Sequence, residues 1–451
     1  MSEQKEERTH RLALRAYRQR EAVLLAFRDL LPPECERLRN LSAREWQRLL
    51  RWLDTSGLAV YFLDRLTQVE VSEMLPREVL ARLQRNLLDN TARTDAMIAE
   101  FSAIHNDFQR AGLSYATLKG FSLWPLSVPR LELRSQLDLD FLIAEKSAVK
   151  ARQILEAMGY RLCAISGPSW EFRANRERAY TDLYQPTPHR CVELHLEAAS
   201  AGSTGRLSRV DVRFFQNIYM PVLSPVDLFL GQGLHISKHV LSDFVRTAHL
   251  IEFRRHILAR HHDDKFWDQL REHAESSPSA AIGLGLATLL IARAMGDFAP
   301  EALTCWTVDR LPATARLWVD LYGSRTVYGD PPGNKLHLLL KREMEAAGAT
   351  PKRPLRQALL PLTLPKTIAQ ATAGETVEAR AMRYRRQLHF IQYRLRFHLV
   401  EGVRYLLESI RWRRQLRRIG EGDPSACSSG RLPKGEVTDR TVRPPQVRVR
   451  R

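Results

Sequence analysis

The sequence predicts an α+β protein in which a small mixed β-sheet is flanked by helical regions on both sides along the chain. Apolar residues recur at helical spacing through residues 1–110 and again through residues 223–350. Between them, residues 111–222 contain short segments in which apolar and polar residues alternate, as in half-buried strands. The 451 residues suffice for about two to four domains, and 44% hydrophobic with 27% charged residues is typical of a globular protein.

Local signals at helix ends support the helical prediction for residues 1–110. Ser42 and Glu45 have the spacing of a capping box, in which the two residues satisfy backbone N–H groups of the first turn. A second helical pattern begins after Pro76 and stops at Gly112, because glycine commonly ends a helix.

The segment Leu137–Ile143 combines strand-like alternation with two aspartates. Because successive side chains of a strand point to opposite faces, Asp138 and Asp140 are expected to share one face. The residues expected on the other face, toward the core, are Leu137, Leu139 and Phe141. Two adjacent carboxylates repel each other unless a cation or a proton lies between them. The pair therefore predicts a divalent metal site.

Two further segments are expected to supply groups to the same site. The predicted strand Leu113–Leu118 ends at a Lys119-Gly120 turn, and a third alternating strand carries Glu193 and His195 on one face. Gly120 would let the backbone approach a phosphate, and the start of the following helix would offer unpaired N–H groups to it. This combination predicts phosphate chemistry.

The residue types indicate how such a site would work. Asp138, Asp140 and Glu193 could hold two Mg²⁺ ions roughly 3.5–4 Å apart, which clamp the attacking and leaving oxygens of a phosphoryl displacement. Mg²⁺ favours such all-oxygen surroundings. Glu193 could also take the proton of an attacking hydroxyl. Lys119 as a point charge and Arg134 as a bidentate fork would neutralise a triphosphate.

Four motifs run through this part of the chain: L-K-G at 118–120, R-x-x-x-D-L-D-F-L-I at 134–143, L-E-A-M-G-Y at 155–160 and V-E-L-H at 192–195. Together they resemble the uncharacterised bacterial nucleotidyltransferase family of the DNA polymerase β-like superfamily. The resemblance extends over roughly residues 40–260. It implies a polymerase β-like sheet that transfers a nucleoside monophosphate from an NTP to an acceptor, with release of pyrophosphate.

The resemblance also implies roles for individual residues. Gly120 would be the turn glycine, Asp138 and Asp140 the metal ligands, and Glu193 the third carboxylate. Two features depart from the superfamily pattern. The residue after the glycine is not serine, so Ser122 becomes the candidate phosphate contact, and the third carboxylate is Glu rather than the usual Asp.

Further candidates lie outside the carboxylate set. Lys238 belongs to a segment that resembles the post-catalytic helix of the family, and is a candidate phosphate contact. His195 either contacts the nucleotide or a carboxylate, or is structural. His235 and His239 lie four residues apart, a spacing that can bind a metal. Because no nearby segment supplies a third ligand, hydrogen bonding to substrate or sheet is favoured over a zinc site.

Beyond residue 222 the chain divides into a helical domain at 223–350, a linker at 351–376, a basic amphipathic helix at 377–419 and a disordered basic tail at 420–451. From Arg380 onward there are 18 Arg and one Lys against six acidic residues, so 13 of the 18 net positive charges lie there. The basic character is therefore local to the C-terminal segment.

The helix at 377–419 has an apolar stripe at spacings of three and four residues: Leu388, Ile391, Leu395, Leu399, Val403, Leu406 and Ile410. Four uses are open. The helix could pack on its own domain with a solvated basic face, or it could contact an anionic membrane surface, a nucleic acid or a protein partner.

The favoured function is a cytoplasmic, Mg²⁺-dependent nucleotidyltransferase. The rivals are a non-catalytic member that keeps the fold as a binding or assembly module, and an RNA-modifying transferase that uses the basic helix. The five cysteines show no C-x-x-C spacing, the N-terminus lacks the apolar core of a secretory signal, and no apolar run reaches ~20 residues. These features favour the cytoplasm, with peripheral attachment to a membrane as the alternative.

Overall fold

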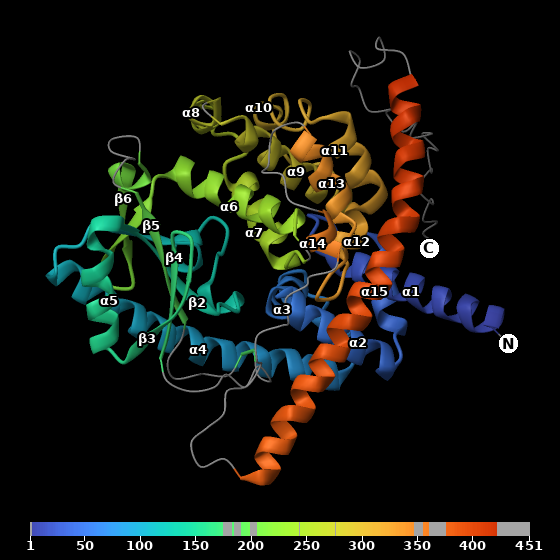
Figure 1. Ribbon diagram of the computed structural model, residues 1–451, viewed down its shortest axis with the longest axis horizontal. Helices are drawn as coiled ribbons and strands as arrows, with labels where there is room; N and C mark the ends of the chain where they lie inside the picture. The colour runs from blue at the N-terminus through green and yellow to red at the C-terminus, as the bar shows by residue number, and fades with distance from the viewer. Residues whose placement is uncertain are drawn as a thin grey trace, which may run out of the picture.

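The computed structural model describes residues 2–174, 183–184, 191–198, 205–242, 244–275, 277–346, 355–359 and 376–421. Within them the protein is α+β, as predicted. Figure 1 shows the sheet at one end of the molecule and most of the helices at the other. The long helix α4 (Arg77–Arg110) passes along both parts, and the C-terminal helix α15 (Val377–Glu421) crosses the helical part.

The predicted N-terminal helical region is confirmed. Besides α4 it contains α1 (Ser2–Leu25), α2 (Ala43–Ser56) and α3 (Ala59–Gln68). The capping box at the start of α2 is present, because the backbone N–H of Ser42 donates to Glu45 Oε2 at 2.9 Å. Leading into the sheet, Gly112 follows α4 with φ +65°, a left-handed conformation that glycine adopts without strain.

Seven strands form one mixed sheet in the order β3-β4-β5-β2-β1-β7-β6. The pairs β1–β7 and β2–β5 are parallel, and the other four are antiparallel. The strands are β1 (Tyr115–Leu118), β2 (Asp138–Ala144), β3 (Tyr160–Ser166), β4 (Ser169–Ala174), β5 (Cys191–Glu197), β6 (Val210–Phe215) and β7 (Ile218–Leu223). The middle of this order, β5-β2-β1, consists of the three strands on which the sequence places the site.

Helices α4 and α5 (Ala148–Ala157) cover the apolar face of the sheet. Phe101 of α4 stacks on Phe141 of β2, with ring centroids 5.7 Å apart. Leu139 belongs to the same core, as predicted, whereas Leu137 precedes the strand and is only half-buried. This packing leaves the opposite face of β2 and β5 for polar groups.

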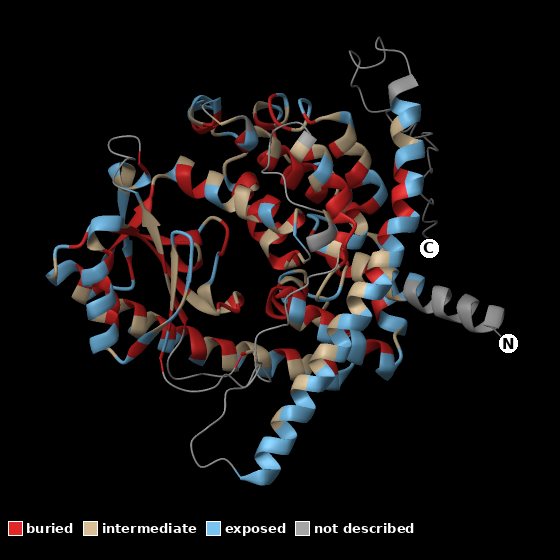
Figure 2. Cartoon of the chain, in the orientation of Figure 1, coloured by how far each residue is buried: buried red, intermediate tan, exposed pale blue. Residues whose placement is uncertain are grey.

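The region after the sheet is helical, as predicted, and shares one core with the N-terminal helices. The buried side chains Trp52, Trp267 and Trp318 all belong to it, and Figure 2 shows buried residues throughout this part. Its helices are α6 (Pro225–Val240), α7 (Thr247–Ala259), α8 (Asp264–Glu275), α9 (Pro278–Met295), α10 (Glu301–Thr304), α11 (Ala313–Trp318), α12 (Ser324–Val327) and α13 (His337–Ala346). The two helical regions are therefore one structural unit.

The C-terminal boundaries differ in detail from the prediction. The expected linker at 351–376 contains a short helix, α14 (Leu355–Leu359), which packs against the main core, and its residues 351–354 and 360–375 lie outside the described residues. The basic helix extends two residues beyond 419, to Glu421. Residues 422–451 of the expected tail also lie outside the described part. Among the described helices, none combines the length and the apolar character that a bilayer-spanning segment needs.

Candidate active site

Three neighbouring strands bring the predicted carboxylates together on one face. Asp140 of β2 is paired in register with Leu118 of β1 on one side and with Glu193 of β5 on the other. Because side chains alternate along each strand, Asp138, Asp140, Glu193 and His195 share the face opposite the aromatic core. The residues between them that face the core are Leu139, Phe141, Val192 and Leu194.

The predicted turn after β1 is present, and its backbone is unusual. Lys119 has φ +49° and Gly120 has φ +44°. A Cβ atom at Gly120 would collide with the side chain of Gln136. Gln136 is buried and cannot easily move aside, because its Nε2 donates to the carbonyl of Asp138 at 2.7 Å. Glycine fits here without strain, and the turn lies close to the start of β2.

Replacing Gly120 with Ala is therefore expected to lower the free energy of unfolding. A non-glycine residue in the left-handed region costs roughly 1–2 kcal/mol, and overpacking typically adds 1–3 kcal/mol. Gly112→Ala is the matched control, since it also has positive φ but has no atom within 4 Å of the added Cβ. In urea denaturation, Gly120→Ala should cost at least about 1 kcal/mol more than the control. Equal losses would show that Gln136 does not constrain the turn.

Lys119 forms an ion pair inside the site. Its Nζ lies 2.9 Å from Oδ1 of Asp140, whose side chain is only 3% exposed. Burial disfavours the charged ammonium, but the charge and hydrogen bond of Asp140 outweigh this, so the pKa of Lys119 lies above its ordinary value. Lys119 is therefore a fixed positive charge beside the carboxylates.

His195 lies between two of the carboxylates. Its Nε2 is 3.0 Å from Asp140 Oδ1 and 3.5 Å from Glu193 Oε2. Burial lowers the pKa of His195, but these two acceptors raise it by more, so the net shift is upward. The hydrogen bond from His195, with a second from the Ser169 hydroxyl, holds the pKa of Glu193 well below its usual range. Glu193 is thus ionised at neutral pH.

One group of potential metal ligands converges among the described residues. It consists of Asp140, Glu193 and His195, whose ligand atoms all lie within 4.8 Å of one another. Asp138 stands beside this group rather than in it. Its burial, and then the adjacent charge of Asp140, raise the pKa of Asp138 to about 6. The sequence assigned Asp138, Asp140 and Glu193 to the metal and did not consider His195 as a candidate ligand, although its place two residues after Glu193 is a usable signal.

Arg134 reaches the site from the segment before β2 and is anchored to a helix. Its Nε lies 3.0 Å from Oε1 of Glu252 on α7, and the Tyr61 hydroxyl donates to the same oxygen at 3.0 Å. Burial disfavours the charge, but Glu252 outweighs it and the pKa of Arg134 is raised, with smaller contributions from Asp138 and Asp140. Arg134 therefore ties the carboxylate site to the helical region, and its phosphate contact stays a prediction.

Two other predicted phosphate contacts have different surroundings. The Ser122 side chain is fully buried, and its hydroxyl donates to the carbonyl of Lys119 at 2.7 Å. It stabilises the turn. Lys238 is exposed on α6. For Ser122 and Lys238 alike, the contact with a nucleotide phosphate stays a prediction.

The histidines of α6 meet a third histidine that the sequence did not indicate. The ring of His235 lies 4.5 Å from that of His239 and 5.2 Å from that of His249 on α7. Burial, followed by the charge of Lys119, lowers the pKa of His235 to about 2, and burial lowers the other two as well. The three rings are therefore neutral. Among the described residues, the potential metal ligands that converge are Asp140, Glu193 and His195, and the three histidines are not part of that group. The structure therefore adds no support to zinc binding at the histidines.

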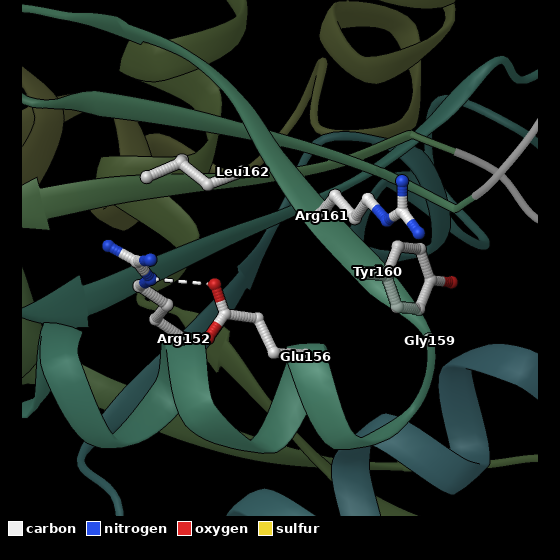
Figure 3. Close-up of a pocket in the computed structure, with 6 residues that line it drawn as sticks. All are labelled: Arg152, Glu156, Gly159, Tyr160, Arg161 and Leu162. Carbon is white, nitrogen blue, oxygen red and sulfur yellow. Dashed lines mark hydrogen bonds and ion pairs between the residues drawn. The ribbon is translucent and has the colours of Figure 1, made fainter. Parts of the chain in front are cut away.

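A surface hollow of about 450 Å³ lies between α5 and β3, away from these groups (Figure 3). Arg152 and Glu156 form an ion pair across its edge, with Nε and Oε1 2.8 Å apart. Its lining residues are Arg152, Glu156, Gly159, Tyr160, Arg161 and Leu162. None of them is a candidate site residue, so the hollow is separate from the carboxylate site.

A mixed sheet between helical regions, with acidic residues on adjacent strands beside a glycine turn, places the protein among the nucleotidyltransferases, a class of transferase enzymes. More particularly, the chain belongs to the family described as uncharacterised nucleotidyltransferase, whose model matches residues 42–296, more than half of the chain. This confirms the family that the sequence motifs resemble. No curated protein matches the chain.

Among the solved structures that resemble the chain are two with 12% identity each. A crystal structure of ANT(2")-Ia in complex with adenylyl-2"-tobramycin has a TM-score of 0.31, and the match covers 40% of this chain and 98% of that one. An antigenic nucleotidyltransferase-like protein from Paracoccidioides brasiliensis has a TM-score of 0.26, with 48% and 95% covered. These likenesses are too distant to carry an inference about the substrate.

Proposed function

We propose that the protein transfers a nucleoside monophosphate from an NTP to a hydroxyl group of an acceptor, with Mg²⁺ bound at the carboxylate site. One observation carries this proposal: β1, β2 and β5 place Lys119, Asp138, Asp140 and Glu193 on one face at adjacent strands. Family membership supplies the reaction class. The positively charged Lys119 is of the type that binds a triphosphate, and the carboxylates are of the type that bind its metal.

The residues present fit a divalent cation. Asp140, Glu193 and His195 converge, and Asp138 adds a carboxylate whose pKa is raised by burial and then by the adjacent charge of Asp140. Carboxylate oxygens predominate, which suits Mg²⁺. When bound, Mg²⁺ would neutralise phosphate charge and make the acceptor hydroxyl easier to deprotonate.

The chain's own groups have separate tasks in this proposal. Lys119 would orient and neutralise the NTP phosphates, and the Gly120 turn would let backbone N–H groups approach them. Glu193 is held ionised by His195 and Ser169, which suits a metal ligand better than a proton acceptor. Arg134, anchored by Glu252, would contribute positive charge from the helical side.

The proposal is tested by incubating the protein with each α-labelled NTP, Mg²⁺ and a cell extract, and then identifying the labelled product. A labelled small molecule or protein together with pyrophosphate release is the expected result. Label in RNA would favour the RNA-modifying alternative. Failure to bind any NTP would favour the non-catalytic binding module.

A further inference from the structure

The C-terminal helix α15 packs on the helical core through only one of its faces. Four buried residues of that face recur at helical spacing, namely Glu401, Tyr405, Glu408 and Trp412, and Ser409 is buried beside them. The hydroxyl of Tyr322 donates to Glu408 Oε2 at 3.3 Å, and the Tyr322 ring lies 6.2 Å from that of Trp412. Polar and aromatic contacts therefore hold the helix in place, without its aliphatic stripe.

The aliphatic stripe of α15 faces away from this contact. Because an α-helix turns about 100° per residue, Val403 and Tyr405 point to nearly opposite sides. Six of the seven side chains of the stripe are between 51% and 68% exposed, namely Leu388, Leu395, Leu399, Val403, Leu406 and Ile410, and Ile391 is half-buried. Figure 2 shows exposed residues along much of α15. An apolar row of this length on a docked helix indicates a binding surface.

Arginine residues accompany the stripe along the helix. Residues 377–421 contain 12 Arg and four Glu, and two of the glutamates, Glu401 and Glu408, are buried in the contact with the core. The outward side of α15 is therefore strongly positive. Exposed arginines next to the stripe by helical position include Arg385, Arg396, Arg414 and Arg418.

The pattern identifies the occupant by its chemistry. A second copy of this chain, paired stripe to stripe, would bring two arginine rows together, which repel. A nucleic acid would neutralise the arginines but would leave six aliphatic side chains without cover. An anionic lipid bilayer would cover the aliphatic side chains and also neutralise the arginines. The aliphatic side chains enter the acyl boundary while the guanidinium groups reach the headgroup phosphates.

We propose that α15 lies on the surface of an anionic bilayer through its aliphatic stripe and so holds the enzyme at a membrane. The face that carries Tyr405, Glu408 and Trp412 stays bound to the helical core. The inference does not depend on nucleotidyl transfer, since it concerns a surface outside the catalytic site.

The test is flotation of the full-length protein with vesicles of phosphatidylcholine and phosphatidylglycerol at 3:1, compared with pure phosphatidylcholine. The wild type should bind the anionic vesicles at least tenfold more tightly. A stripe variant, Leu399→Ser with Val403→Ser and Leu406→Ser, should lose at least tenfold of that affinity. These three positions are exposed, so unchanged circular dichroism and thermal unfolding are expected.

Two matched variants separate the stripe from other contributions. Val149→Ser with Val212→Ser removes equally exposed aliphatic groups elsewhere on the surface and should leave binding unchanged. Arg385→Gln with Arg396→Gln and Arg414→Gln should reduce the preference for anionic lipid. Residues 422–451, which contain six Arg, are present in every variant and cannot explain a difference.

Several outcomes would overturn the proposal. It is wrong if the wild type binds neither vesicle, or if the stripe variant binds as well as the wild type. It is also wrong if the stripe variant converts a wild-type dimer to a monomer in analytical ultracentrifugation, because a second copy then covers the stripe. Binding of RNA with the same dependence on the stripe would overturn it too. Because Asp140→Asn leaves this surface intact, that variant should float like the wild type whatever its catalytic activity.

Discussion

Replacing Asp140 with Asn is expected to lower kcat/KM for nucleotidyl transfer by at least about 10³-fold, which corresponds to ~4 kcal/mol of transition-state stabilisation. Asp140 is the buried carboxylate that Lys119 and His195 both contact, at 2.9 Å and 3.0 Å. Asn has nearly the same shape but no charge, so the variant would lose a proposed ligand for the cation and the carboxylate that contacts Lys119 and His195. Steady-state kinetics with the labelled NTP and the identified acceptor measure the effect.

The matched control for Asp140→Asn is Asp211→Asn. Asp211 is an exposed carboxylate on the edge strand β6 of the same sheet, so its replacement should leave kcat/KM unchanged. Circular dichroism and thermal unfolding should confirm that both variants fold. An Asp140→Asn protein that keeps most of its activity would contradict the assignment of this carboxylate to the catalytic site.

Replacing Glu252 with Gln is expected to lower the free energy of unfolding by about 3–5 kcal/mol, the usual cost of removing one partner from a buried ion pair. The Arg134 and Glu252 side chains are only 13% and 2% exposed, and their atoms lie 3.0 Å apart. Without Glu252, the guanidinium would stay in a poorly solvated position with its principal counter-charge removed. Chemical denaturation followed by circular dichroism measures this loss.

An exposed ion pair in the same protein provides the control for Glu252→Gln. Arg152 and Glu156 are 45% and 39% exposed, so Glu156→Gln should cost no more than about 1 kcal/mol. Combining Arg134→Leu with Glu252→Leu should cost less than the sum of the two single changes, since neither charge is then left alone. Equal effects of Glu252→Gln and Glu156→Gln would show that the buried pair does not support the fold.

Most of the carboxylate face of the sheet could be predicted because it depends on residues close together in the chain. Alternation from Asp138 to Ile143 places Asp138 and Asp140 on one face, whatever the rest of the fold does. The Gly120 turn is equally local. The same kind of signal exists in the strands β4 and β6, where apolar and polar residues alternate, but we did not predict these segments or β7 as strands.

Other features of the site required contacts between distant segments. His249 joins His235 and His239 from another helix, and Glu252 anchors Arg134 from 118 residues away. Nothing in the spacing of these residues indicates that they meet. Helix packing alone decides it, because it brings α6 and α7 to the sheet.

The sequence by itself determined the alternation that gathers the carboxylates, the position of the glycine turn, and the amphipathic pattern of residues 377–419, since each is a property of neighbours along a strand, turn or helix. The tertiary structure decided which face of that last helix is buried. Its aliphatic stripe would suit a core, yet Tyr405 and Trp412 occupy the contact with the helical region and the stripe remains exposed. Periodicity defines the faces of an element, whereas the shape and polarity of the surface it meets select the face that is covered.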